Sequence, residues 1–324
     1  SGSSLTGGNG GAGGGGGPAT SGRNGAEGGG GGDGGIGVFF VDSGATLNNS
    51  GIIQGGGGGK GGKGGTAASG KTDGADGAFG LGGVGISGAG LTITNGGMIA
   101  GGTSGDGVTQ ANAVTFTGGS NVLRFLNATA GLFGNIAVVG SLTFDQNGID
   151  TTVDNAVTGT GDVIKSGDAM VTLSKVNIYT GSTLVSAGTL RAGDVRVFSV
   201  GSEHDVASGA TLDLNNHGQE VRALSGAGHV SLGSATLTVG GVNASSTFSG
   251  TIDGTGGLAK IGTGTFTLAG TSSYTGPTQV FSGGVLQAGA ANAFAARSAH
   301  EVNSSATLDL NDFDQTIGSL FGAG

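Results

Sequence analysis

The chain contains no cysteine and no tryptophan among its 324 residues, and it has only two prolines. The absence of cysteine excludes disulfide bonds and thiolate metal sites. Charged residues make up only 10% of the chain, and 21 Asp and Glu against 12 Lys and Arg give a net charge of −9. No basic cluster is interleaved with aromatic residues, so we expect no nucleic-acid partner, because phosphate binding requires a concentrated cationic face.

Long hydrophobic segments are missing as well. No run of about 20 apolar residues occurs, so no segment is expected to cross a bilayer as a helix. The first residues, SGSSLTGGNGG, do not resemble a signal peptide. If the protein is exported, we therefore expect this chain to be a processed or excised piece. Helix-forming sequence is confined to Ala290–Ala299, where we expect one short turn or helix.

Glycine is abundant, with 80 residues. Plain disorder is disfavoured because 35% of the residues are hydrophobic and few are charged. The apolar residues alternate with Thr or Asp in short runs such as Thr211–Leu214, Thr265–Leu268 and Thr307–Leu310. This period of two predicts strands that carry their apolar side chains on one face.

The clearest feature is an internal repeat: Gly159–Gly193 returns about 95 residues later as Gly254–Gly289. The matched pairs include Lys165 with Lys260, Leu173 with Leu268, and Tyr179 with Tyr274. Because both tyrosines recur at the same place, we interpret them as packing or turn residues. A repeat of this kind is typical of a stacked fold in which neighbouring coils bury each other's apolar face.

The strands are three to five residues long, and roughly 20 residues cover three of them, which matches one coil of a parallel β-helix. An antiparallel sandwich is the alternative. The long-range repeat and the lack of Asn-Gly hairpins favour the β-helix. We therefore predict an all-β fold, a β-solenoid forming a single domain over residues 1–324. Residues 1–105 are expected to hold Gly-rich loops and the first coils, and residues 106–324 the regular coils.

Near the N-terminus, Ile36–Gly56 and Val84–Gly102 look like equivalent coils. Their alignment predicts that Ala45–Asn48 pairs with Gly90–Ile93. It also predicts that Ile52 and Ile53 pair with Met98 and Ile99.

Two glycine-rich stretches, Gly7–Gly35 and Gly55–Gly83, are expected to leave the coil as loops. Two alternatives remain for them. They are either flexible surface loops or packed polyglycine II strands, which have three residues per turn and approach closely because they lack a β-carbon.

Several motifs suggest ligands but lack the required context. Gly65–Thr72 matches the phosphate-binding pattern G-x-x-x-x-G-K-T, yet neither a buried strand nor a helix is expected beside it. Asp73, Asp76 and Asp106 lie among glycines, and no second copy supports a calcium-binding repeat. The four histidines, His204, His217, His229 and His300, are not spaced as zinc ligands.

Catalytic patterns are also absent. There is no G-x-S-x-G elbow. The carboxylates Asp145, Asp150 and Asp154, and likewise Asp309, Asp312 and Asp314, fall in expected turns rather than in a groove. We therefore expect no catalytic residue, no metal site and no cofactor, and we predict that the chain is not an enzyme.

One motif resembles a known family. The pattern G-x-L-x-K-x-G-x-G-T-x-T-L-x-G-x-x-x-Y-T-G-x-T-x-V spans Gly256–Val280, and Gly161–Val185 is a degenerate second example. It resembles the passenger-associated transport repeat of bacterial autotransporters. The resemblance implies a right-handed β-helical passenger domain, exported through a C-terminal outer-membrane β-barrel and displayed or released at the surface of a Gram-negative cell.

The resemblance also suggests a function. Many such passengers without an added enzymatic domain are adhesins or self-association factors, so we expect a surface-displayed or secreted binding protein. Its partners would be a host-surface or matrix component or an identical passenger. The alternative is a rigid stalk that carries an enzymatic or toxin module encoded outside this chain.

Overall fold

The computed structural model describes residues 4–281 and 283–324. Its named strands pair in parallel with equivalent strands of neighbouring coils, so the fold is an all-β solenoid, as predicted. Within the described residues, one 3-10 turn, η1 (Gly241–Asn243), is the only helical segment. The chain forms two compact units: residues up to Asn121 with Phe125–Ala137, and Val122–Arg124 with Val138–Gly324. The prediction of a single domain over residues 1–324 stays a prediction.

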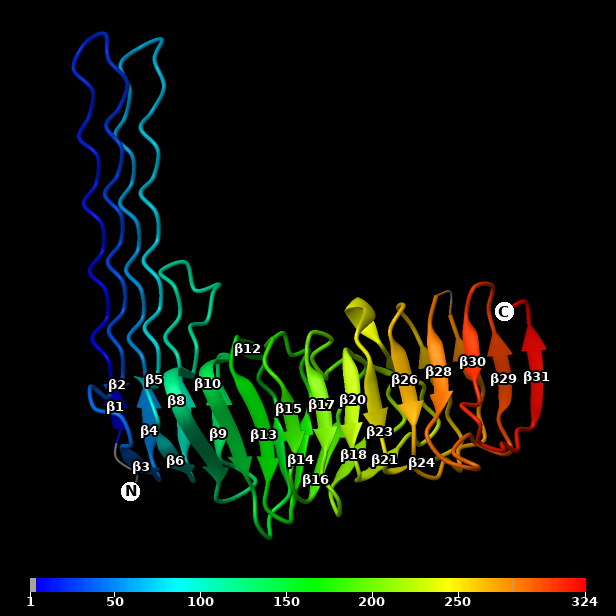
Figure 1. Cartoon of the computed structure of the whole chain (residues 1–324). Helices are drawn as coiled ribbons and strands as arrows, with labels where there is room; N and C mark the ends of the chain where they lie inside the picture. The colour runs from blue at the N-terminus through cyan, green and yellow to red at the C-terminus, as the bar shows by residue number, and fades with distance from the viewer. Residues whose placement is uncertain (1–3, 282) are drawn as a thin grey trace. The chain divides into compact units, whose positions relative to one another are not determined.

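The first unit contains the N-terminal strands (Figure 1). They are β1 (Ser4–Thr6), β2 (Val38–Phe39), β3 (Thr46–Asn49), β4 (Ile52–Gln54), β5 (Ile86–Gly88), β6 (Thr92–Asn95), β7 (Met98–Ala100), β8 (Val114–Phe125) and β9 (Gly131–Phe133). One sheet has the order β1-β4-β7-β9, β5 lies between β2 and β8, and β6 lies between β3 and β8. Each coil thus stacks on its equivalent in the next.

The register of the first coils partly matches the prediction. Ile52 lies opposite Met98, as expected. The predicted pairing of Ala45–Asn48 with Gly90–Ile93 is wrong by one residue, because Leu47 lies opposite Ile93. A slip of one residue would turn one of these side chains to the opposite face, and the observed register keeps both on the same face.

The second unit continues with shorter strands. They are β10 (Ile136–Asp145), β11 (Thr151–Val153), β12 (Val157–Gly159), β13 (Asp162–Ser166), β14 (Met170–Leu173), β15 (Thr183–Val185), β16 (Thr189–Ala192), β17 (Glu203–Val206), β18 (Thr211–Asp213), β19 (Gln219–Val221), β20 (Ala223–Gly226), β21 (His229–Ser231), β22 (Leu237–Val239), β23 (Ser246–Phe248), β24 (Thr251–Asp253), β25 (Leu258–Lys260), β26 (Thr265–Leu268), β27 (Thr278–Val280), β28 (Val285–Ala288), β29 (Ala299–Val302), β30 (Thr307–Asp309) and β31 (Ser319–Gly322).

These strands form three sheets. The first runs β10-β13-β15-β17-β20-β23-β26-β28-β30, the second β11-β14-β16-β18-β21-β24, and the third β19-β22-β25-β27-β29-β31. Residues Ala290–Ala299 form turns that lead into β29, so the turn alternative holds there. Parallel pairing between coils satisfies the backbone groups that such short strands would otherwise leave free.

The core is built from apolar ladders inside the coils. In the second sheet, one ladder of completely buried residues passes through Val171, Leu190, Leu212, Val230 and Ile252, each opposite the next. Alternation with a period of two turns the intervening Thr, Arg and Asp residues outward. Stacking therefore supplies the core that no single coil could form.

The two sequence repeats occupy different faces of the solenoid. The first repeat supplies β13 and β15 to the first sheet and β14 and β16 to the second. The second repeat supplies β25 and β27 to the third sheet and β26 and β28 to the first. The repeat of about 95 residues therefore recurs with its strands moved from the first to the third sheet and from the second to the first.

Within the described residues, no helix is long and apolar enough to cross a membrane.

Candidate functional site

The two glycine-rich loops of the first unit form four extended arms that lie side by side (Figure 1). We name them arm 1 (residues 7–17), arm 2 (25–35), arm 3 (55–65) and arm 4 (74–83). Hydrogen bonds between arms recur at every third residue. The N–H groups of Gly10, Gly13 and Gly16, for example, donate to the carbonyls of Gly57, Lys60 and Lys63 at 2.8, 2.7 and 2.7 Å. Three-residue periodicity with bonds between the arms is the packing of polyglycine II, so the ordered alternative is the one observed.

Glycine is required where two arms touch. A β-carbon built on Gly59 of arm 3 would lie 1.9 Å from the carbonyl oxygen of Gly11, and one on Gly58 would lie 2.0 Å from that of Gly80. Only every third residue of arm 3 faces outward, which explains its Gly-Gly-x sequence. Arm 1 has neighbours on fewer sides, and a β-carbon on Gly11 would meet no atom within 4 Å.

The side chains of the bundle sit at the outward positions. Lys60 and Lys63 follow this spacing on arm 3, and the Nζ of Lys63 pairs with an Asp76 oxygen at 2.5 Å. Both partners are largely exposed, so this pair contributes little to stability. The hydrogen bond from Lys63 lowers the pKa of Asp76.

Two carboxylates cover free backbone donors at one edge of the bundle. Asp76 accepts from the N–H of Gly64 at 2.9 Å, and Asp73 accepts from the N–H of Ala67 at 2.7 Å. Nearer the strands, the corresponding N–H of Gly58 donates to the carbonyl of Thr103 at 2.8 Å. The short loop of residues 101–113 turns back before it reaches Gly64 and Ala67. Beyond that point, the two aspartates accept the hydrogen bonds that a backbone carbonyl of this loop accepts at Gly58.

Arm 4 changes composition at this same point. Gly82 faces the short loop, and a β-carbon there would lie 2.0 Å from the carbonyl oxygen of Gly102. Three residues earlier the position is Phe79, whose side chain is half exposed. Glycine therefore occurs where a neighbouring segment is present and larger side chains where it is absent. Sequence reasoning missed this spacing, although the three-residue periodicity of Gly55–Gly65 was a visible signal.

The phosphate-loop match lies at the tip of the second loop. Gly65–Thr72 leaves arm 3, turns through Gly70 at φ +77° and enters arm 4, so neither a strand precedes it nor a helix follows it. The tip of the first loop has an equivalent turn through Gly22 at φ +83°. The converging donors that a phosphate loop requires are therefore not assembled at these residues.

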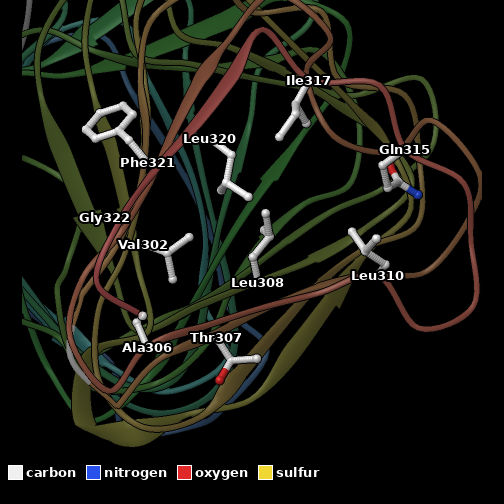
Figure 2. A pocket seen from close by; sticks show the side chains of 11 residues that line it. Val302, Ala306, Thr307, Leu308, Leu310, Gln315, Ile317, Leu320, Phe321 and Gly322 are labelled. Carbon is white, nitrogen blue, oxygen red and sulfur yellow. The ribbon is translucent and has the colours of Figure 1, made fainter.

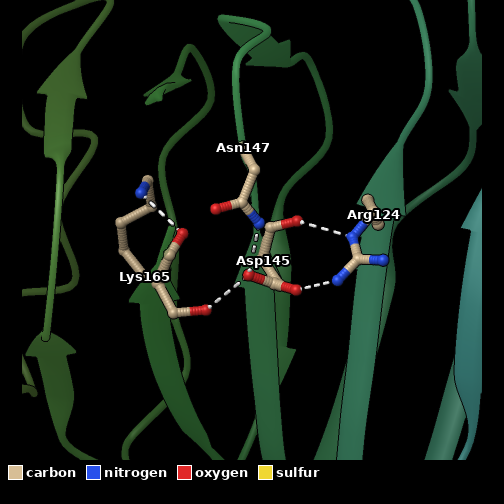
Figure 3. Close-up of polar contacts among 5 residues, drawn as sticks. Arg124, Asp145, Asn147 and Lys165 are labelled. Carbon is tan, nitrogen blue, oxygen red and sulfur yellow. Dashed lines mark hydrogen bonds and ion pairs between the residues drawn. The ribbon is translucent and has the colours of Figure 1, made fainter. Parts of the chain in front are cut away.

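The second unit carries a polar cluster on the outside of its first sheet (Figure 3). Asp145 pairs with the guanidinium of Arg124 and accepts hydrogen bonds from Ser166 Oγ and Asn147 Nδ2, each at 3.1 Å. The bond from Arg124 holds the pKa of Asp145 below its usual value. The other predicted turn acids near it also accept backbone or hydroxyl bonds: Asp150 from Met170 N–H and Asp154 from Ser174.

Lys165 lies beside this cluster but points inward. Its side chain is completely buried, and its Nζ donates to the carbonyls of Ser166, Gly167 and Ala187 at 2.7, 2.8 and 3.0 Å. Burial lowers its pKa. Lys260 is buried in the same way and donates to Ile261 and Gly262. The repeated lysine therefore closes a turn and is not available to a ligand.

The repeated tyrosines are packing residues, as predicted. Tyr179 is completely buried, and its hydroxyl bonds Thr183 Oγ1 at 2.6 Å, which in turn bonds Ser202 Oγ at 2.7 Å. Burial raises the pKa of Tyr179 to about 12. Tyr274 makes the equivalent bond to Thr278 at 2.7 Å.

The remaining candidate ligands do not come together. Among the described residues, no group of three His, Asp or Glu side chains could hold a metal ion. Asp106 accepts bonds from Ser104 and Val108 within its own turn, and Asp309 accepts from Gln287 and Asn311. His204 and His300 are buried in separate sheets, and His229 pairs with Asp253 at 3.0 Å.

A cavity of about 580 Å³ lies inside the last described coil (Figure 2). Its lining is mainly apolar and includes Val302, Leu308, Leu310, Ile317, Leu320 and Phe321. Val302 is buried, whereas Leu310, Leu320 and Phe321 are 48%, 61% and 53% exposed, so the cavity is open to solvent. The lining contains no charged residue, so it provides hydrophobic contact but no acid–base group.

Comparison with known proteins identifies the repeats. The passenger-associated transport repeat matches residues 163–192 and 258–288. The adhesin autotransporter BmaC of Brucella suis biovar 1 (strain 1330) is 41% identical over 155 residues, which are 46% of this chain and 4% of that protein. Both matches support an autotransporter passenger. No solved structure matches the chain.

Each repeat of the passenger contains four strands from successive coils. The first repeat contains β13 to β16, and the second contains β25 to β28. The buried lysine and tyrosine both lie within or beside these segments. The similarity to an autotransporter adhesin places the passenger outside the cell, at the surface of a Gram-negative bacterium. The chain spans only 4% of the length of the relative it matches.

Proposed function

We propose that this passenger is an adhesin and that its polyglycine arms are the binding element. The observation that carries the proposal is the hydrogen-bonded bundle of four arms, which holds rows of outward side chains on a stiff support. A preorganised surface loses less conformational entropy on binding than flexible loops do. The relative with 41% identity is named an adhesin, which agrees with this role.

The proposed partner is a host-surface or matrix component, or a second passenger. The arms carry few charged side chains, so recognition would use hydrogen bonds and shape over an extended face. We propose that the passenger acts without catalysis. The turn carboxylates support this, because those with observed bonds accept them from their own or neighbouring turns.

The test is adhesion by the complete autotransporter displayed on a Gram-negative cell. Gly59→Ala disrupts contact between arms, and Gly11→Ala is the matched control because its β-carbon meets open space. We expect Gly59→Ala to reduce adhesion to cells or matrix, or aggregation between displaying cells, while Gly11→Ala leaves it unchanged. Equal adhesion by both variants would overturn the role of the arms. Loss of all adhesion with retained turnover of a substrate would instead favour the stalk alternative.

A further inference from the structure

Two histidines are enclosed in the core of the passenger. The ring of His204 on β17 is completely buried, with its Nδ1 3.2 Å from the carbonyl of Ser202. Its Nε2 is buried and has no hydrogen-bond partner. The ring lies against Phe198, with the centroids 5.7 Å apart. This site accommodates a neutral imidazole, but a protonated ring would place an unpaired charge among apolar groups.

The same arrangement occurs after the second repeat, on another face of the solenoid. His300 on β29 is completely buried, its Nδ1 is 3.1 Å from the carbonyl of Ser298, and its Nε2 is again unpartnered. Phe294 lies against the ring at 5.8 Å. The first histidine belongs to the first sheet and the second to the third sheet.

Among the described residues of its own strand and of the two paired strands, no charged side chain faces the buried side of His204. The neighbouring strands β15 and β20 contain no charged residue. On its own strand, Glu203 and Asp205 alternate outward, and Asp205 accepts a bond from Ser225 at 2.8 Å. Arg222 precedes β20 and pairs with Glu203 at 3.7 Å on the exposed side. The buried ammonium of Lys165, on β13, is held by backbone carbonyls.

The surroundings of His300 are equally uncharged inside the coil. Strands β27 and β31 contain no charged residue. Glu301, on the same strand, alternates outward and accepts from Gln279 at 2.8 Å. Tyr274 carries no charge at acidic or neutral pH, because burial raises its pKa further. Within these described strands, no carboxylate is therefore positioned to compensate a charge on the ring.

We propose that His204 and His300 make the solenoid acid-sensitive. Protonation of either ring opens the solenoid locally, at the coil that contains it. At neutral pH both imidazoles fill their sites as uncharged side chains. In acid each ring gains a proton only when its coil separates and admits water. The openings occur on two faces of the solenoid, while the ladders of the second sheet stay closed.

The direction in which stability changes with pH follows from proton linkage. Burial lowers the pKa of His204 from 6.5 to about 4, and it also lowers that of His300. The unfolded chain therefore binds more protons than the folded one below pH 6.5, so stability is full above this pH and falls as the pH approaches 4. For His204 alone, this shift corresponds to a decrease of about 300-fold in the folding equilibrium constant.

The direct test is an NMR titration of the four imidazoles in the 324-residue passenger. We expect the signals of His204 and His300 to stay neutral well below pH 6.5, and hydrogen exchange at pH 5 to rise first in β17 and β29. Ordinary titration of both rings near pH 6.5 in the folded protein would overturn the proposal, as would uniform exchange across all strands.

Variants provide an independent readout. His204→Leu places at this position the residue found opposite it in the next coil, Leu224, so it preserves an apolar interior. We expect the double variant His204→Leu/His300→Leu to lose much of the decrease in stability between pH 6.5 and 4. His217→Leu, which changes a partly exposed histidine in a loop, should keep the original profile. An unchanged pH profile in a folded double variant would contradict the proposal, and the titration decides if that variant fails to fold.

Discussion

The carbonyl oxygen of Gly11 lies 1.9 Å from the position that a β-carbon on Gly59 would occupy, whereas a β-carbon on Gly11 would meet nothing within 4 Å. The two glycines touch each other across arms 1 and 3, but only one of them points its hydrogen at the neighbour. Glycine content alone does not reveal this difference, because both residues belong to similar glycine runs.

We expect Gly59→Ala to separate the arms and Gly11→Ala to leave them intact. The reason is the backbone overlap at Gly59, which no side-chain movement can relieve. Hydrogen exchange and limited proteolysis of residues 7–35 and 55–83 measure the effect, while the strands of the second unit serve as internal reference. Comparable protection in both variants would show that the close packing of arms is not maintained in solution.

The buried lysine of the first repeat gives a second prediction. Lys165→Met keeps the apolar stem but removes three hydrogen bonds to carbonyls, so we expect the free energy of unfolding to fall by about 1–3 kcal/mol. Lys175→Met, at an exposed position, should change it by less than about 0.5 kcal/mol. Denaturant unfolding of both variants checks this. Equal stability would mean that water replaces the ammonium at no cost.

Much of the fold could be predicted because strand alternation and repetition leave direct traces in the sequence. Leu190 and Leu212 lie opposite each other because both belong to alternating runs in successive coils. The local register of Leu47 was harder to predict, because the two N-terminal coils differ in length and a shift of one residue still aligns small polar residues.

Packed arms were one of the two predicted alternatives, but the register between them could not be predicted, because glycine has no side chain to define it. The hidden signal is an offset of 48 residues, visible in the bonds from Leu81 N–H to Asp33 and from Gly57 N–H to Asn9. In each case, a side-chain oxygen of the first loop accepts a hydrogen bond from a backbone N–H of the second loop. The hydrogen bonds of Lys165 could not be predicted either, because strand alternation indicates the face of its side chain but not the carbonyls that accept from its ammonium.

A third prediction concerns the buried hydroxyl chain. Tyr179→Phe and Thr183→Val each remove one member of a bonded pair, so each should lower stability by about 0.5–1.5 kcal/mol. Because the two groups bond each other, the double variant should lose less than the sum of the two single losses. A double-mutant cycle in denaturant measures this coupling. Strict additivity would indicate that Tyr179 contributes only through the packing of its ring.

The last prediction concerns the edge of the bundle that Asp73 and Asp76 cover. Replacing both with Ala leaves the N–H groups of Gly64 and Ala67 exposed beside a glycine-rich arm. An uncovered row of backbone donors can pair with another chain, as an open sheet edge does. We therefore expect Asp73→Ala/Asp76→Ala to increase self-association of the passenger, measured by sedimentation velocity over a range of concentrations.

The matched control removes two other acids. Glu27→Ala/Asp42→Ala makes the same change in net charge at exposed positions whose side chains cap no backbone donor among the described residues. Reduced charge repulsion acts equally in both double variants, so only loss of the caps distinguishes them. Association in the Asp73/Asp76 variant alone supports the edge explanation. Equal association in both would attribute it to charge, and two monomeric variants would show that these carboxylates do not limit lateral growth.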